Sequence, residues 1–165
     1  MPATPTVPTY RYRRESSLVT MPSPASTVIN PGDLIWQNAG VAATAGAFTW
    51  GASLGATQSG FRLLFLGVAQ DMKIASDTST TPIGIRTEGV FEFPCAALAS
   101  AAHIGTLVGP AQDAAGNFLA SQVLAPVAAF ANSIGTVVEE AAVGQTFLVV
   151  YLQSWLLYTS QGVAS

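Results

Sequence analysis

Charge is nearly absent from the second half of this chain, and this limits how the chain can meet water. Between Pro94 and Ser165 there is no lysine or arginine, and the carboxylates are Asp113, Glu139 and Glu140. A soluble monomer normally has roughly a quarter of its residues charged, whereas this chain has 9% charged and 50% hydrophobic residues. A fold of this size cannot bury all of that apolar surface in one core. We therefore expect other chains to cover part of it, as in an assembly subunit.

The first 32 residues differ in composition from the rest and predict an extended arm. Six of the ten prolines lie between Pro2 and Pro31, and proline disfavours helix and favours extended backbone. Residues 1–15 contain three arginines against one carboxylate, a net +2, while the remaining residues have three cations against eight carboxylates, a net −5. We expect residues 1–32 to order on a partner, and residues 33–165 to form a β-rich domain.

An alternation of aromatic and basic side chains marks this arm as the candidate contact site. The residues are Tyr10, Arg11, Tyr12, Arg13 and Arg14. Tyrosine and arginine are enriched in protein interfaces, and they can also stack on bases or hold phosphates. Three arginines on an otherwise acidic chain provide little positive charge for binding the phosphates of nucleic acid. The sequence therefore favours a protein partner over nucleic acid.

Short aromatic and β-branched runs, separated by turn residues, predict an all-β fold, either a small barrel or a sandwich. Residues 83–93 alternate, with Glu88, Val90 and Glu92 on one face and Phe91 and Phe93 on the other. The other expected strands are 34–37, 47–50, 61–69, 104–108, 117–121, 134–138 and 145–152. One or two short helices are expected, over 94–103, which begins with proline and is rich in alanine, and over 126–132.

No recognised catalytic motif occurs, and the sequence predicts no enzyme, cofactor or metal site. His103 is the only histidine, and we expect a structural role at a helix end. Glu88 and Glu92 would stand about 13 Å apart on their strand, too far to share a metal ion. Asp71 and Asp77 lie in a polar loop without the spacing of a calcium motif.

The remaining features argue for a protein made in the cytoplasm. Cys95 is the single cysteine, which excludes an internal disulfide, and its apolar neighbours predict a buried thiol. No signal peptide is recognisable at the N-terminus. The longest apolar stretch, residues 147–158, is shorter than the about 20 residues that a membrane helix needs. The expectation is therefore that the protein does not associate with a membrane.

Several motifs, read in order, resemble the capsid decoration (cement) proteins of tailed bacteriophages. They are FLGVAQD (65–71), GIRTEGVFEFPCAA (84–97), IGTLVGPAQDAAGNFLAS (104–121) and IGTVVEEAAVGQTFLVVYL (134–152), and NPGDLIWQNAG (30–40) also fits. The resemblance covers about two thirds of the chain. Its motifs are structural, and the arm and the residues after Tyr151 match no pattern of the family.

The resemblance implies a virion protein on the outer surface of an icosahedral head. It would be a small β-rich protein, commonly a homotrimer, that binds the major capsid protein and bridges neighbouring capsomers. Two alternatives remain open from the sequence. One is a fibre or adhesin-like β-barrel module that binds carbohydrate, which surface tryptophans at Trp36, Trp50 or Trp155 would favour. The other is a coat protein that assembles by itself.

Overall fold

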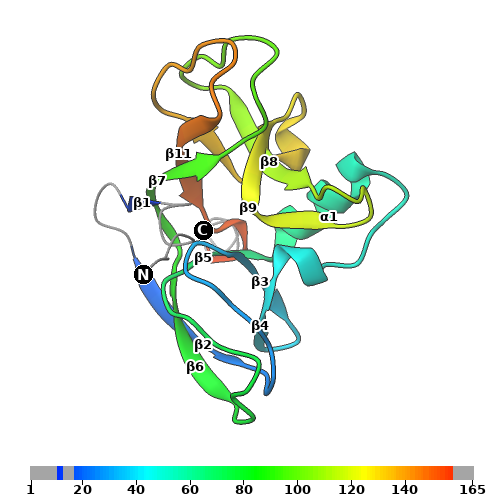
Figure 1. The fold of residues 1–165 in the computed structure, drawn as a ribbon, viewed down its shortest axis with the longest axis vertical. Coiled ribbons are helices and arrows are strands. Elements are labelled where there is room, and N and C mark those ends of the chain that lie inside the picture. The colour runs from blue at the N-terminus through cyan, green and yellow to red at the C-terminus, as the bar shows by residue number, and fades with distance from the viewer. Residues whose placement is uncertain (1–10, 13–16, 158–165) are drawn as a thin grey trace, which may run out of the picture.

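The computed structural model describes residues 11–12 and 17–157. These residues form an all-β fold of two sheets in which the named strands pair antiparallel. The first sheet has the order β1 (Arg11–Tyr12), β7 (Glu88–Pro94), β11 (Phe147–Gln153), β10 (Gly135–Val137), β8 (Leu107–Gln112) and β9 (Leu119–Pro126). The second has the order β2 (Leu18–Ser23), β6 (Thr81–Arg86), β5 (Phe65–Ala69), β3 (Leu34–Asn38) and β4 (Val41–Thr44). Figure 1 shows the second sheet below the first.

Short helical elements sit beside the sheets. Helix α1 (Leu54–Leu64) leads directly into β5, and the 3-10 turns η2 (Ala45–Ala47) and η3 (Phe130–Asn132) lie in connections. In Figure 1 helix α1 lies beside β8 and β9. The predicted fold class, all-β with few and short helices, is confirmed for the described residues.

Buried hydrophobic residues form two clusters. The larger one joins the two sheets and includes Phe61 of α1, Phe65 of β5, Phe91 and Phe93 of β7, and Leu148 of β11. The smaller one lies on the other side of the second sheet, around Ile35, Leu66, Ile83 and Ile85, where Leu156 and Leu157 pack against it. The second sheet is therefore apolar on both faces.

Gly67 lets β5 serve both clusters. The register between β3 and β5 shifts at Ile35 and Trp36, which marks a bulge or irregularity in the pairing. A Cβ atom at Gly67 would collide with the carbonyl oxygen of Arg86 on β6. Only glycine allows this close approach of two backbones. All five residues of β5 are buried.

The predicted alternation along 83–93 is present, but the run is two strands in different sheets. β6 and β7 meet at Thr87, which is buried and whose N–H donates to Ser17 O. Along β7 the side of Phe91 and Phe93 is buried and the side of Glu88 and Glu92 is half-buried. The buried connection from β6 to β7 contains no glycine, proline or other turn residue. The alternation of side chains in the sequence therefore continues across it without a break.

The expectation of a strand over 61–69 is wrong for its first half. Residues 54–64 are helical, and Ser53 caps the helix by accepting a hydrogen bond from the N–H of Ala56. The buried side of α1 contains Thr57, Gln58 and Arg62 beside Phe61, so its apolar period is weak. Polar residues are held there by specific partners, as where Gln58 Nε2 donates to Pro110 O at 2.8 Å.

The helix predicted over 94–103 does not form. Pro94 ends β7, and the backbone that follows is bonded to the connection between β10 and β11. Cys95 N–H donates to Thr146 O, and Ala102 exchanges two hydrogen bonds with Ala141. These long-range bonds replace the helical ones that alanine would favour. Of the helix predicted over 126–132, the last three residues form η3, and the strand predicted over 47–50 is also absent.

The described part of the predicted arm is extended and belongs to a sheet. β2 pairs with β6 along six residues, from Leu18 opposite Arg86 to Ser23 opposite Thr81. Ser23 and Ile29 are fully buried. A boundary at residue 32 therefore does not separate this part of the chain from the sheets.

Lys73 and Asp77 fix the loop between β5 and β6. Lys73 is 3% exposed and donates to Asp77 Oδ2 at 3.1 Å and to Ser79 O at 2.7 Å. The Asp77 carboxylate also accepts from Ser79 and Thr81. These bonds, those of Ser79 first, hold the pKa of Asp77 well below its ordinary value.

We expect Gly67→Ala to lower the free energy of unfolding by about 1–3 kcal/mol, because the new methyl group must displace the β6 backbone. Gly51→Ala is the matched control, since a Cβ there meets its neighbours at ordinary distances of 3.5 to 3.6 Å. Urea unfolding of both variants measures the difference. Equal unfolding free energies would contradict the close approach at Gly67.

We expect Asp77→Asn to reduce stability at pH 7 and to weaken its dependence on acid. Because the pKa of Asp77 lies below its unfolded value of about 3.8, its contribution is complete above that value and lost as pH falls through the folded-state pKa. Denaturant unfolding at pH 7 and at pH 3 tests this. The exposed neighbour Thr78 supplies the control, and Thr78→Ala should keep the wild-type pH dependence. An unchanged dependence in Asp77→Asn would argue against the role of this carboxylate.

Candidate interaction surfaces

The predicted contact residues of the arm lie at the edge of the first sheet or outside the described residues. Arg11 and Tyr12 form β1, which pairs with β7 opposite Glu92 and Phe91. Tyr10, Arg13 and Arg14 lie outside the described residues. The backbone of the arm thus adds a strand to the chain's own sheet, and its contact with a partner stays a prediction.

Two connections form one end of the molecule, and we call them the apical loops. They are residues 95–106, between β7 and β8, and residues 138–146, between β10 and β11; Figure 1 shows them side by side at the top. Their backbones are linked: besides the Ala102–Ala141 pair, Leu98 N–H donates to Gln145 O and Gly144 N–H to Leu98 O. The loops therefore hold each other in place.

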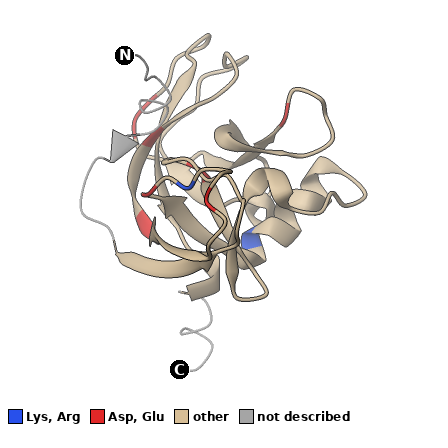
Figure 2. Ribbon diagram, turned by 60° about the horizontal axis from the view of Figure 1, so that its bottom comes forward, with Lys and Arg blue, Asp and Glu red and all other residues tan. Residues whose placement is uncertain are grey.

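Large apolar side chains are exposed at this end. Ile104 is 65% exposed, Val143 66%, and Phe147, just after the second loop, 44%. The small residues around them include Ala96, Ala97, Ala99 and Ala101, which are also exposed. Figure 2 shows how few charged residues the described chain has. Exposed apolar groups on a charge-poor surface are typical of a contact with another protein.

The ionisable side chains of the apical loops bind mainly within the loops. Glu140 accepts from the N–H of Ile104 at 3.0 Å and lies 2.7 Å from Nδ1 of His103. The hydrogen bond from Ile104 and then the one from His103 lower the pKa of Glu140. His103 thus joins two loops, and the expected position at a helix end is wrong because no helix forms there.

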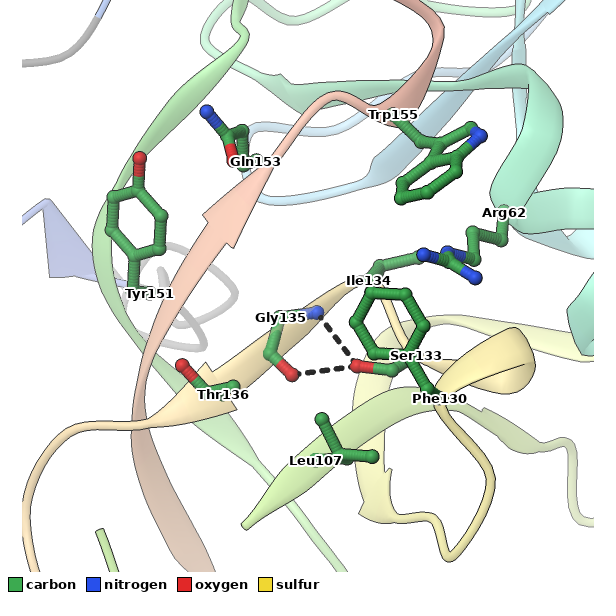
Figure 3. A pocket seen from close by; sticks show the side chains of 10 residues that line it. All are labelled: Arg62, Leu107, Phe130, Ser133, Ile134, Gly135, Thr136, Tyr151, Gln153 and Trp155. Atoms are coloured by element: carbon green, nitrogen blue, oxygen red, sulfur yellow. Dashed lines mark hydrogen bonds between the residues drawn. The ribbon is translucent and has the colours of Figure 1, made fainter. Parts of the chain in front are cut away.

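A pocket of about 270 Å³ lies on the outer side of the first sheet. Figure 3 shows its wall, which combines strand residues with α1, η3 and the segment after β11. The lining residues are Arg62, Leu107, Phe130, Ser133, Ile134, Gly135, Thr136, Tyr151, Gln153 and Trp155. None of them is a carboxylate.

Arg62 is the charged group of the pocket. Its guanidinium carbon lies 3.5 Å from the ring centre of Trp155 and 4.1 Å from that of Phe130. The contacts of Arg62 with the two rings are cation–π interactions. The rings themselves meet edge to face, with centres 6.0 Å apart. Burial lowers the pKa of Arg62. The cation is therefore fixed between two aromatic side chains from distant parts of the sequence.

Other polar groups of the pocket have defined partners. Ser133 Oγ donates to Gly135 O and accepts from Gly135 N–H, as drawn in Figure 3. Tyr151 donates its hydroxyl to Glu88 Oε2 at 2.8 Å. Glu88 therefore binds a tyrosine of the neighbouring strand.

The three tryptophans are in different environments. Trp36 is 8% exposed and donates its indole N–H to Thr44 O, so it belongs to the core. Trp50 is half-buried and packs against the larger cluster. Trp155 is half-buried at the pocket. Of the three tryptophans that the carbohydrate-binding alternative expects at the surface, Trp50 and Trp155 are therefore partly accessible, and Trp36 is buried.

Within the described ranges, no three residues among His, Cys, Asp and Glu are grouped so that they could hold a metal ion. Asp71 accepts a hydrogen bond from Gly84 N–H, while Asp77 binds Lys73, so the two carboxylates act separately. Cys95 is buried, and burial raises the pKa of its thiol. The same ranges contain no helix with the length and apolar character needed to cross a lipid bilayer.

The pocket was not predicted from the sequence. Arg62 appears in the sequence as a cation at the edge of a strand, and Phe130 and Trp155 lie 68 and 93 positions further along. A capped helix over residues 54–64 would have been the useful signal, since Ser53 is a favourable N-cap residue. It would not have indicated which rings meet Arg62.

Comparison with known proteins finds a weak structural similarity. No protein-family model matches the chain, and no curated protein matches it. Among solved structures, the N base of the head fibre gp8.5 of bacteriophage phi29 is similar, with 14% sequence identity and a TM-score of 0.42. The similarity covers 84% of this chain and 96% of that chain.

Proposed function

We propose that this protein is a structural component of a bacteriophage head, and more specifically a decoration protein on the outer surface of the capsid. In this role it binds the major capsid protein and bridges neighbouring capsomers. The observation that carries the assembly part of this proposal is the end formed by the apical loops, where Ile104, Val143 and Phe147 are exposed on linked backbones. Such a surface favours burial against another chain.

The motifs that resemble cement proteins support the same role. FLGVA of the first motif is β5, GVFEF lies in β7, and the last motif contains β10 and all of β11 except its last residue. The resemblance therefore falls on the strands that build both sheets.

The proposed action is mechanical and needs no catalysis or cofactor. A typical protein interface buries about 800 Å² on each partner. A subunit that touches two capsomers gains from both contacts at once, because the second contact forms at a high effective concentration. Many such bridges together oppose the pressure of packaged DNA. Nucleic acid and membrane are not partners in this proposal.

Self-association and the arm complete the proposal. The apical loops are assigned to contacts between copies of this chain in a homotrimer, which would cover their apolar side chains. Tyr10, Arg11, Tyr12, Arg13 and Arg14 are assigned to the capsid, where an extended segment can add a strand to an exposed sheet edge.

The alternatives differ in simple measurements. A fibre or adhesin-like module would bind immobilised glycans in an array, and Trp155 in the pocket would be its candidate aromatic contact. A self-assembling coat protein would sediment as particles in pure form. A decoration protein does neither, and it binds preformed heads.

We expect the purified protein to bind undecorated heads and to raise the temperature at which they release DNA. Cosedimentation and a thermal-release assay with a DNA-binding dye measure the two effects. The variant is Arg13→Glu with Arg14→Glu, which reverses two charges of the arm and should weaken attachment by about tenfold or more. Heads that do not retain the wild-type protein would refute the proposed function. Retention of the charge-reversed variant at full occupancy would refute the assignment of the arm alone.

We expect Ile104→Asp with Val143→Asp to dissociate the proposed trimer without unfolding the chain, because both side chains are exposed and a buried carboxylate at an interface is costly. Sedimentation equilibrium measures the mass. Leu63→Asp on α1, where the side chain is 55% exposed, is the control away from the apical loops. A monomeric wild-type protein would refute the trimer, and a trimer that persists in the double variant would place its contacts elsewhere.

A further inference from the structure

The charge of Arg62 lacks a counter-ion among the described residues. Its side chain is buried, with the residue 6% exposed, and its contacts are the rings of Phe130 and Trp155. The ion pairs of Lys73 with Asp77 and of His103 with Glu140 do not involve Arg62. Its guanidinium donates no hydrogen bond within the described residues.

This arrangement is unusual in energetic terms. A guanidinium has five N–H donors in one plane, and a buried charge is normally paired and hydrogen-bonded. Cation–π contacts with the two rings offset part of the cost of burial. They do not supply the oxygen acceptors that its N–H groups need.

The pocket is where an acceptor can reach that edge. Figure 3 shows the guanidinium between the two rings and directed into the space bounded by Ile134 and Gly135. The space, about 270 Å³, is lined mainly by apolar groups, and Thr136 and Gln153 add a hydroxyl and an amide on the strand side. It has room for one side chain with its end group and not for a large ligand.

We propose that this pocket binds the carboxylate of an aspartate or glutamate side chain on an acidic segment of a partner protein. A carboxylate matches the planar fork of arginine in two parallel hydrogen bonds. The surroundings supply the remaining complementarity, because Arg, Trp and Tyr are the side chains that dominate binding energy at protein interfaces. Phe130, which is 62% exposed, forms a rim that such a segment would cover.

A protein segment fits these residues better than an acidic sugar does. Sugars bind aromatic residues by stacking on a ring face, and here the guanidinium of Arg62 already lies 4.1 Å from the ring centre of Phe130 and 3.5 Å from that of Trp155. Sugars also need several polar partners, whereas Ser133 is bonded to Gly135 and Tyr151 to Glu88. That the segment belongs to the capsid rests on the proposed function; the preference for a carboxylate does not.

The test compares two small probes that differ in charge, with the full chain and without capsids. N-acetylglutamate N-methylamide and N-acetylglutamine N-methylamide are titrated against isotope-labelled protein by NMR, following the Arg62 Nε–H and Trp155 indole signals. We expect saturable shifts with the glutamate probe at a Kd in the millimolar range and at least about tenfold weaker binding of the glutamine probe. Equal shifts with both probes, or no saturable shift with either, would overturn the proposal.

Variants locate the effect. Arg62→Met should abolish the shift of the Trp155 indole while the protein stays folded, since replacing an unpaired buried charge by an apolar side chain of similar length removes a desolvation cost. Leu63→Ala, next to Arg62 on α1 but outside the pocket lining, should bind like the wild type. Binding that persists in Arg62→Met would overturn the proposal, as would saturable binding of methyl glucuronide in place of the glutamate probe. If Arg62→Met does not fold, the comparison of the two probes on the wild type still decides.

Discussion

Strand β5 holds the two hydrophobic clusters together, and the other elements depend on its position. Phe65 and Val68 belong to the larger cluster, while Leu66 and Ala69 belong to the smaller one. Gly67 makes this possible by permitting the close approach to β6. Helix α1 runs directly into β5, and Ser154 after β11 donates its hydroxyl to Phe65 O at 3.0 Å. The strand thus sets the places of the helix and of the segment that together supply Arg62 and Trp155.

Strands in which buried and exposed side chains alternate, and which are bounded by turn residues, could be predicted from the sequence. The alternation around Phe91 and Phe93 and the turn before Leu34 are examples, because they depend on near neighbours in the chain. Helix α1 could not be predicted in the same way. Its buried side contains Gln58 and Arg62, and these residues are stabilised there by groups far along the chain, namely Pro110 for Gln58 and the two rings for Arg62.

The segment after Pro94 shows the opposite failure. Its alanines favour a helix, yet its N–H groups find acceptors in residues 141–146, and these tertiary bonds win over local propensity. Of the candidate sites, the arm could be proposed from composition alone, while the pocket depends on three segments that only the fold brings together. The charge-poor half of the chain forms the apical loops and most of the pocket lining. Its lack of charge therefore affects two separate surfaces of the molecule.

The way the pocket is assembled links recognition to the folding equilibrium. Its cation comes from α1, one ring from η3 and the other from the segment after β11, so the site does not exist in an unfolded chain. A ligand that binds only the native state stabilises it by RT ln(1 + [L]/Kd). At the high local concentration of the proposed capsid partner, a contact that is weak in solution would keep the attached subunit folded at temperatures where the free subunit has begun to unfold. The durability of such a protein is then a property of the complex.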